Sequence, residues 1–76
     1  MELAKESALI ETILFLESEP VTEASMATVS GLTEEVVAKC IEVLKEKYKD
    51  ESAGMELDFI TGGWALVPKK ENWEVL

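Results

Sequence analysis

The order of hydrophobic and polar positions along the chain predicts helices first and a hairpin afterwards. In residues 4–17, AKESALIETILFLE, apolar side chains recur at the three-to-four-residue spacing of a helix. The SEP segment that follows ends this helix, because the residue before Pro20 is disfavoured in the α region. We expect one broad apolar arc to face the core, formed by Leu9, Ile10, Ile13, Leu14 and Leu16.

Capping residues predict two further helices joined by a tight turn. Thr22 is the expected N-cap of a short helix that reaches Val29, and Gly31 is the expected stop with positive φ. Thr33 is the expected N-cap of a third helix that runs to about Lys49. We expect its buried arc to contain Val36, Val37, Cys40, Ile41, Val43, Leu44 and Tyr48.

The segment MELDFITGGWALVP alternates around Gly62-Gly63 and predicts a β-hairpin that ends at Pro68. If these glycines form the whole loop, the pairs are Thr61–Trp64, Ile60–Ala65, Phe59–Leu66 and Asp58–Val67. Side chains expected to face the core are Leu57, Phe59 and Leu66, and those expected on the outer face are Ile60, Ala65 and Val67, beside Glu56 and Asp58.

Three helices followed by a hairpin, with a tight glycine turn between the second and third helices, predict a winged helix-turn-helix. This is an α+β fold that is mainly α-helical. A chain of 76 residues is long enough for one small core. We expect residues 1–68 to form the winged-helix domain and residues 69–76 to form a tail, in which Trp73 has little to pack against.

The charge of the chain argues against the DNA binding that this fold often serves. Seven lysines, no arginine and sixteen acidic residues give a net charge of −9, whereas DNA binders neutralise phosphates with Lys and Arg. Glu34 and Glu35 also open the third helix, where a reading helix would meet bases. Both fit ordinary capping chemistry, because the helix dipole favours anions there. We therefore expect no direct sequence-specific DNA binding.

The residues needed for catalysis or metal binding are not present in the sequence. There is no histidine, and a single cysteine, Cys40, lies on a predicted buried arc and forms no zinc site. We expect no catalytic, cofactor or metal site and hence no enzyme. No apolar run approaches the ~18 residues that span a membrane, and the lone cysteine fits a reducing cytoplasm.

Apolar residues beyond the predicted core indicate a surface for another protein. Ala4, Ala8 and Phe15 lie nearly opposite the Leu9 and Ile13 side of the first helix. Further apolar candidates for this interface are Ile60 and Val67 on the wing and Trp73 in the tail. The alternative is that the tail and wing fold over the first helix and bury these residues within the domain.

Four sequence features in order resemble the N-terminal domain of bacterial segregation and condensation protein B. They are Phe15 followed by Pro20, the turn and helix start GLTEE of residues 31–35, a long Lys/Glu-rich helix ending in Tyr48, and GGWAL of residues 62–66. The resemblance runs from IETILFLESEPVT to the KKENW of the tail and covers nearly the whole chain.

This resemblance implies a non-enzymatic dimerisation and scaffold module in chromosome condensation and segregation. Its implied partners are a second copy, a kleisin subunit similar to segregation and condensation protein A, and an SMC protein, in a cytoplasmic, nucleoid-associated complex. It also implies that residues 69–76 begin a linker toward a second winged-helix domain. Two alternatives stay open. One is a DNA-binding winged-helix regulator that meets phosphate with Lys39, Lys45, Lys69 and Lys70, and the other is the regulatory domain of an enzyme.

Overall fold

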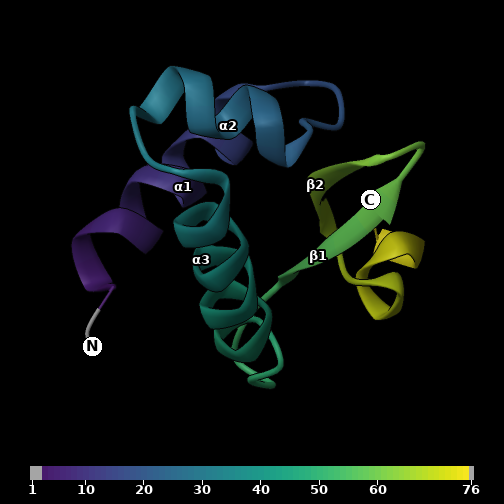
Figure 1. Ribbon diagram of the computed structural model, residues 1–76. Coiled ribbons are helices and arrows are strands. Elements are labelled where there is room, and N and C mark those ends of the chain that lie inside the picture. Colours follow the sequence, from purple (N-terminus) through teal and green to yellow (C-terminus); the bar gives the residue numbers. More distant parts are fainter. Residues whose placement is uncertain (1–2, 76) are drawn as a thin grey trace.

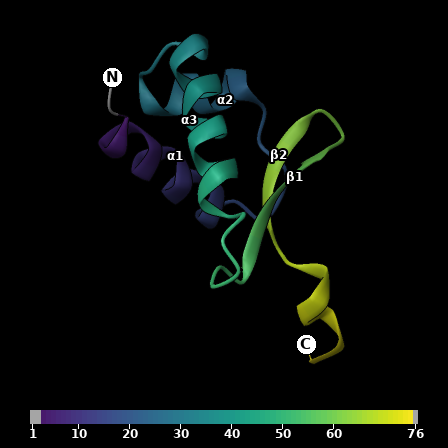
Figure 2. The same cartoon turned by 90° about the horizontal axis from the view of Figure 1, so that it is seen from below.

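The computed structural model describes residues 3–75 and has the predicted mainly helical α+β architecture. Three helices gather on one side, and a two-stranded antiparallel hairpin with a short 3-10 helix lies on the other (Figures 1 and 2). The elements are α1 (Ala4–Leu16), α2 (Glu23–Ser30), α3 (Glu34–Lys47), β1 (Met55–Ile60), β2 (Gly63–Pro68) and the 3-10 helix η1 (Lys70–Val75).

The predicted caps are confirmed. The Thr22 hydroxyl accepts a hydrogen bond from the backbone N–H of Ser25 at 3.0 Å, which satisfies a donor in the first turn of α2. The Thr33 hydroxyl does the same for Val36 at the start of α3. Gly31 ends α2 with a φ of 78°, a conformation that glycine adopts without strain.

The core lies between the three helices. Its buried apolar side chains are Leu3, Ile10, Leu14, Met26, Val37, Cys40, Ile41 and Leu44. The Cys40 side chain is fully buried, which confirms its predicted place in the core. Leu57, Leu66 and Trp64 of the hairpin pack against this cluster from the side. The core therefore fixes how α1, α3 and the wing are placed relative to one another.

The predicted apolar arc of α1 is only partly correct. Ile10 and Leu14 are buried, together with Ser7, but Leu9 is 42% exposed and Leu16 is 72% exposed. Apolar side chains surround this helix, so spacing alone does not select the side that faces the core. Packing against α3 selects the side of Ile10 and Leu14.

A second error concerns α3. Val43 is exposed instead of buried, because it lies at the edge of the arc formed by Val37, Cys40, Ile41 and Leu44.

The predicted hairpin is present, but its loop and register differ from the prediction. Thr61 and Gly62 form the loop, with φ values of 47° and 82°, and Gly63 is the first residue of β2. Two successive positive φ angles are the signature of a type I′ turn. The observed pairs are Ile60–Gly63, Phe59–Trp64, Asp58–Ala65, Leu57–Leu66, Glu56–Val67 and Met55–Pro68.

The α1–α2 linker approaches the hairpin at Gly63 so closely that this strand position has no room for a side chain. A Cβ atom at Gly63 would lie 3.0 Å from the Pro20 carbonyl carbon and from the Val21 nitrogen. The linker comes this close because Val21 and Trp64 exchange two backbone hydrogen bonds of 2.8 Å.

The new register keeps the predicted faces for most residues. Leu57 and Leu66 pack against the core, whereas Phe59 is exposed beside the Trp64 ring, in contrast to the prediction. The distance between those two ring centroids is 4.9 Å.

The tail folds back on the base of the wing. The carbonyl of Gly54 accepts hydrogen bonds from the Lys69 backbone N–H at 2.9 Å and from the Asn72 side-chain amide at 3.2 Å. The Trp73 indole N–H donates to the Pro68 carbonyl at 2.9 Å, but the Trp73 side chain remains half exposed. The tail therefore caps the end of the hairpin and leaves α1 uncovered (Figure 2).

Candidate interaction surfaces

One flank of α1 borders an open apolar groove that faces the wing. We call it the Phe15 groove, and its volume is about 370 Å³. Phe15 is 76% exposed at its edge, and Ala4 and Ala8 are exposed on the same side of α1. The groove is lined by Ala8, Glu11, Thr12 and Phe15 of α1, Tyr48 after α3, Met55 of β1 and Leu66 of β2.

The one carboxylate in the Phe15 groove is paired. Glu11 accepts hydrogen bonds from the Tyr48 hydroxyl and from the Lys47 ammonium, the latter at 3.0 and 3.1 Å. Partial burial would raise the pKa of Glu11, but the hydrogen bonds from Tyr48 and Lys47 and the Lys47 charge together hold that pKa below its usual value. The charge of Glu11 is thus balanced inside the groove.

The same contact changes the titration of Tyr48. Burial, the hydrogen bond to Glu11 and the negative charge of Glu11 together raise the pKa of Tyr48 to about 12. The phenol therefore stays protonated at neutral pH and holds α1 against the end of α3. An apolar groove with a neutral, fixed polar floor can receive an apolar side chain of another chain without leaving a charge buried.

A different flank of α1 borders a second groove, of about 460 Å³, which we call the Leu16 groove. It lies where α1 ends, and the linker and α2 form its other walls. The lining residues are Ile13, Leu16, Glu17, Glu19, Pro20, Val21, Thr22, Ser25 and Val29. The sequence pattern does not indicate this surface, because it predicts Leu16 in the core, whereas Leu16 is exposed.

The structure does not bring all six predicted interface residues together. Ala4, Ala8 and Phe15 share one side of α1. Ile60 and Val67 are on the outer face of the hairpin, opposite the Leu57–Leu66 pair that packs against the core. Trp73 lies in η1 beyond the end of β2. The candidate surface is therefore the α1 part alone, extended by Tyr48, Met55 and Leu66.

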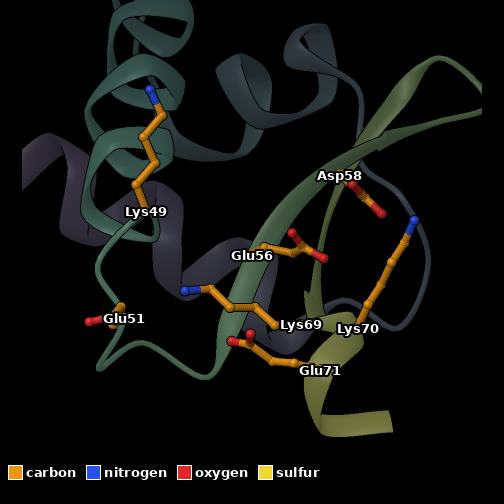
Figure 3. A pocket seen from close by; sticks show the side chains of 7 residues that line it. All are labelled: Lys49, Glu51, Glu56, Asp58, Lys69, Lys70 and Glu71. Atoms are coloured by element: carbon orange, nitrogen blue, oxygen red, sulfur yellow. The ribbon is translucent and has the colours of Figure 1, made fainter.

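Two of the four lysines that DNA binding would need are paired with carboxylates, and the other two lie near acidic side chains. Along α3, ammonium–carboxylate distances are 3.7 Å for Lys39–Glu35 and 3.3 Å for Lys45–Glu42. Lys69 donates to the Asp50 carbonyl at 2.7 Å. Figure 3 shows Lys69 and Lys70 in a hollow that they share with acidic side chains, and the lining residues are Lys49, Glu51, Glu56, Asp58, Lys69, Lys70 and Glu71. This surface has no excess of positive charge for phosphates.

Residues 3–75 contain no group of three or more Cys, Asp or Glu side chains arranged to hold a metal ion. No helix in the same part of the chain combines the length and the apolar character needed to cross a membrane.

The sequence and the fold of this chain are similar to those of known proteins. A family model described as the segregation and condensation complex subunit ScpB matches residues 8–76. A solved dimer of the ScpB N-terminal domain complexed with ScpA peptide is 27% identical, with a TM-score of 0.89, over 96% of this chain and 91% of that chain. ScpB from Mycobacterium tuberculosis is 16% identical, with a TM-score of 0.87, over 99% of this chain and 47% of that chain.

A conserved hypothetical protein from Chlorobium tepidum is also similar, at 16% identity and a TM-score of 0.81, over 95% of this chain and 46% of that chain. The two structures at 16% identity show the winged-helix-like fold alone, and the chain spans about half the length of each. A search of curated proteins finds no match. Because the family match covers most of the residues, the chain belongs to the ScpB family of segregation and condensation complex subunits.

Proposed function

We propose that this chain is a dimerisation and scaffold module of the bacterial SMC–kleisin complex. In this proposal it pairs with a second copy, holds a segment of the kleisin subunit, and acts at the nucleoid without catalysing a reaction. The observation that carries the pairing is Phe15, a large aromatic side chain that is three-quarters exposed at the edge of an apolar groove. The relative crystallised as a dimer with an ScpA peptide supports the same assembly.

The electrostatics of the Phe15 groove support self-association of an acidic chain. Two copies with a net charge of −9 repel each other, so their contact has to avoid opposing carboxylates. In the Phe15 groove the Glu11 carboxylate is paired with Lys47 and Tyr48. Ala4 and Ala8 have small side chains, which permit the close approach of another helix along the same flank.

Replacing Phe15 tests this proposal. We expect Phe15→Asp to raise the dimer dissociation constant at least about tenfold, because a new charge would be buried at the contact. The control is Val75→Asp, which adds the same charge at an exposed apolar position in η1. Sedimentation equilibrium of both variants gives the constants. Equal self-association of the Phe15→Asp and unmodified chains would remove this flank of α1 from the interface.

A further inference from the structure

The Leu16 groove has the features of a docking surface in its own right. Leu16 is exposed, and Val29 on α2 is 70% exposed across from it. Leu9 and Ile13 precede Leu16 along α1 at i, i+4 and i+7 spacing, so the apolar stripe continues beyond the groove. A stripe of this spacing beside a groove is the surface that an amphipathic helix occupies.

The charge of the Leu16 groove is negative, in contrast to the Phe15 groove. Glu17 and Glu19 line it, and no lysine does. Neither carboxylate has an ion-pair partner among residues 3–75. The last turn of α1 also contains no basic residue, so the negative end of its helix dipole adds to the two carboxylates.

These two observations select the partner. A second copy of the chain, with a net charge of −9, would meet two carboxylates without ion-pair partners in this groove, whereas the Glu11 carboxylate of the Phe15 groove is paired with Lys47. A helix with leucine-like side chains on one face and Lys or Arg beside them would satisfy both the apolar walls and the carboxylates. We propose that the Leu16 groove binds a basic amphipathic helix of another protein. The proposal rests on the proposed function, in which the Phe15 groove is taken by a second copy.

The test uses a synthetic amphipathic helix with a leucine stripe flanked by Lys and Arg, and a matched peptide with Glu at every basic position. Fluorescence anisotropy measures the dissociation constant of each peptide for the 76-residue chain. We expect the basic peptide to bind at least about tenfold more tightly than the acidic one. We expect Leu16→Ser, and separately E17Q combined with E19Q, to weaken that binding at least about fivefold.

Phe15→Ser is the matched control, because it changes the adjacent residue on the other flank of α1. It should leave peptide binding within about twofold while weakening self-association. Leu16 and Phe15 are both exposed, so both variants should fold, and circular dichroism checks this.

Three results would overturn the proposal. They are absence of basic-peptide binding, equal binding of both peptides, and unchanged binding by the Leu16→Ser chain. Loss of peptide binding in the Phe15→Ser chain, or loss of self-association in the Leu16→Ser chain, would also overturn it. Either result would mean that the peptide binds the Phe15 groove or that the second copy binds the Leu16 groove. Failure of the proposed function is distinguishable, because it would leave a monomer that still binds the basic peptide through Leu16.

Discussion

Phe15 and Leu16 are neighbours in the sequence, yet their side chains leave α1 on different flanks and border two separate grooves. Successive residues of a helix are separated by 100° around its axis, so a third direction remains for the buried side chains of Ile10 and Leu14. A helix that is apolar all round is usually buried. In α1 only the side of Ile10 and Leu14 is buried within the domain. We therefore assign the Phe15 flank to a second copy of the chain and the Leu16 flank to a helix of another protein.

The Glu11–Tyr48 contact predicts an unusual tyrosine titration. Tyr48 is the only tyrosine of the chain, so tyrosinate absorbance reports this residue alone. We expect its pKa at about 12 in the folded chain, above the ordinary 10.0, because burial and Glu11 disfavour the phenolate. In Glu11→Gln the pKa should fall toward the ordinary value while remaining raised by burial. Titration of the folded chain near pH 10 would show that the contact does not form.

The same raised pKa predicts how stability depends on alkaline pH. Because the folded chain holds the phenol proton more tightly than the unfolded chain, the stabilisation is complete below pH 10.0 and is lost as pH rises through about 12. Urea unfolding across this range should show the loss in the unmodified chain. A Tyr48→Phe chain should lack this component, and an identical decline in both chains would contradict the assignment.

Gly63 predicts a stability difference between two glycines of the wing region. A Cβ atom at Gly63 meets the Pro20 and Val21 backbone at 3.0 Å, whereas one at Gly54 meets only the Asn72 side-chain amide, at 3.7 Å. We expect Gly63→Ala to lower the free energy of unfolding by about 1–3 kcal/mol, because two backbone segments have to separate. Gly54→Ala should change it by no more than about 1 kcal/mol. Equal urea midpoints for the two variants would mean that the Pro20–Val21 backbone does not pack closely against Gly63.

Leu9 and Ile10 test the orientation of α1. Ile10 is fully buried and Leu9 is 42% exposed, although both are apolar neighbours. We expect Ile10→Ala to lower the free energy of unfolding by about 2–5 kcal/mol through the cavity it leaves. Leu9→Ala should lower it by less than about 1 kcal/mol. Thermal unfolding of both variants provides the measurement, and the reverse order would mean that the helix is rotated.

The features predicted correctly from the sequence are those that local chemistry determines. Thr22 and Thr33 cap helices because their hydroxyls satisfy backbone donors within three residues, and Gly31 adopts a positive φ. The hairpin register depends instead on a contact between distant segments. Gly62-Gly63 looked like the loop, but Gly63 is needed where Pro20 and Val21 approach, so the turn begins at Thr61.

The candidate surface was predicted only in part, for a related reason. Phe15, Ala4 and Ala8 were recognised because they lie apart from the predicted arc of α1, and all three are exposed. Ile60 and Val67 were grouped with them although they belong to the outer face of the hairpin. The helical spacing predicts one broad apolar arc that includes Leu16, whereas the apolar residues of α1 point in three directions and Leu16 is exposed.

The central claim is that this domain pairs with a second copy of itself, and the mass of the unmodified chain in solution tests it most directly. Light scattering during size exclusion, over about a hundredfold range of concentration, should give a mass of twice 8.4 kDa that persists on dilution. A mass of 8.4 kDa at every concentration would contradict the claim that the chain is a dimerisation module.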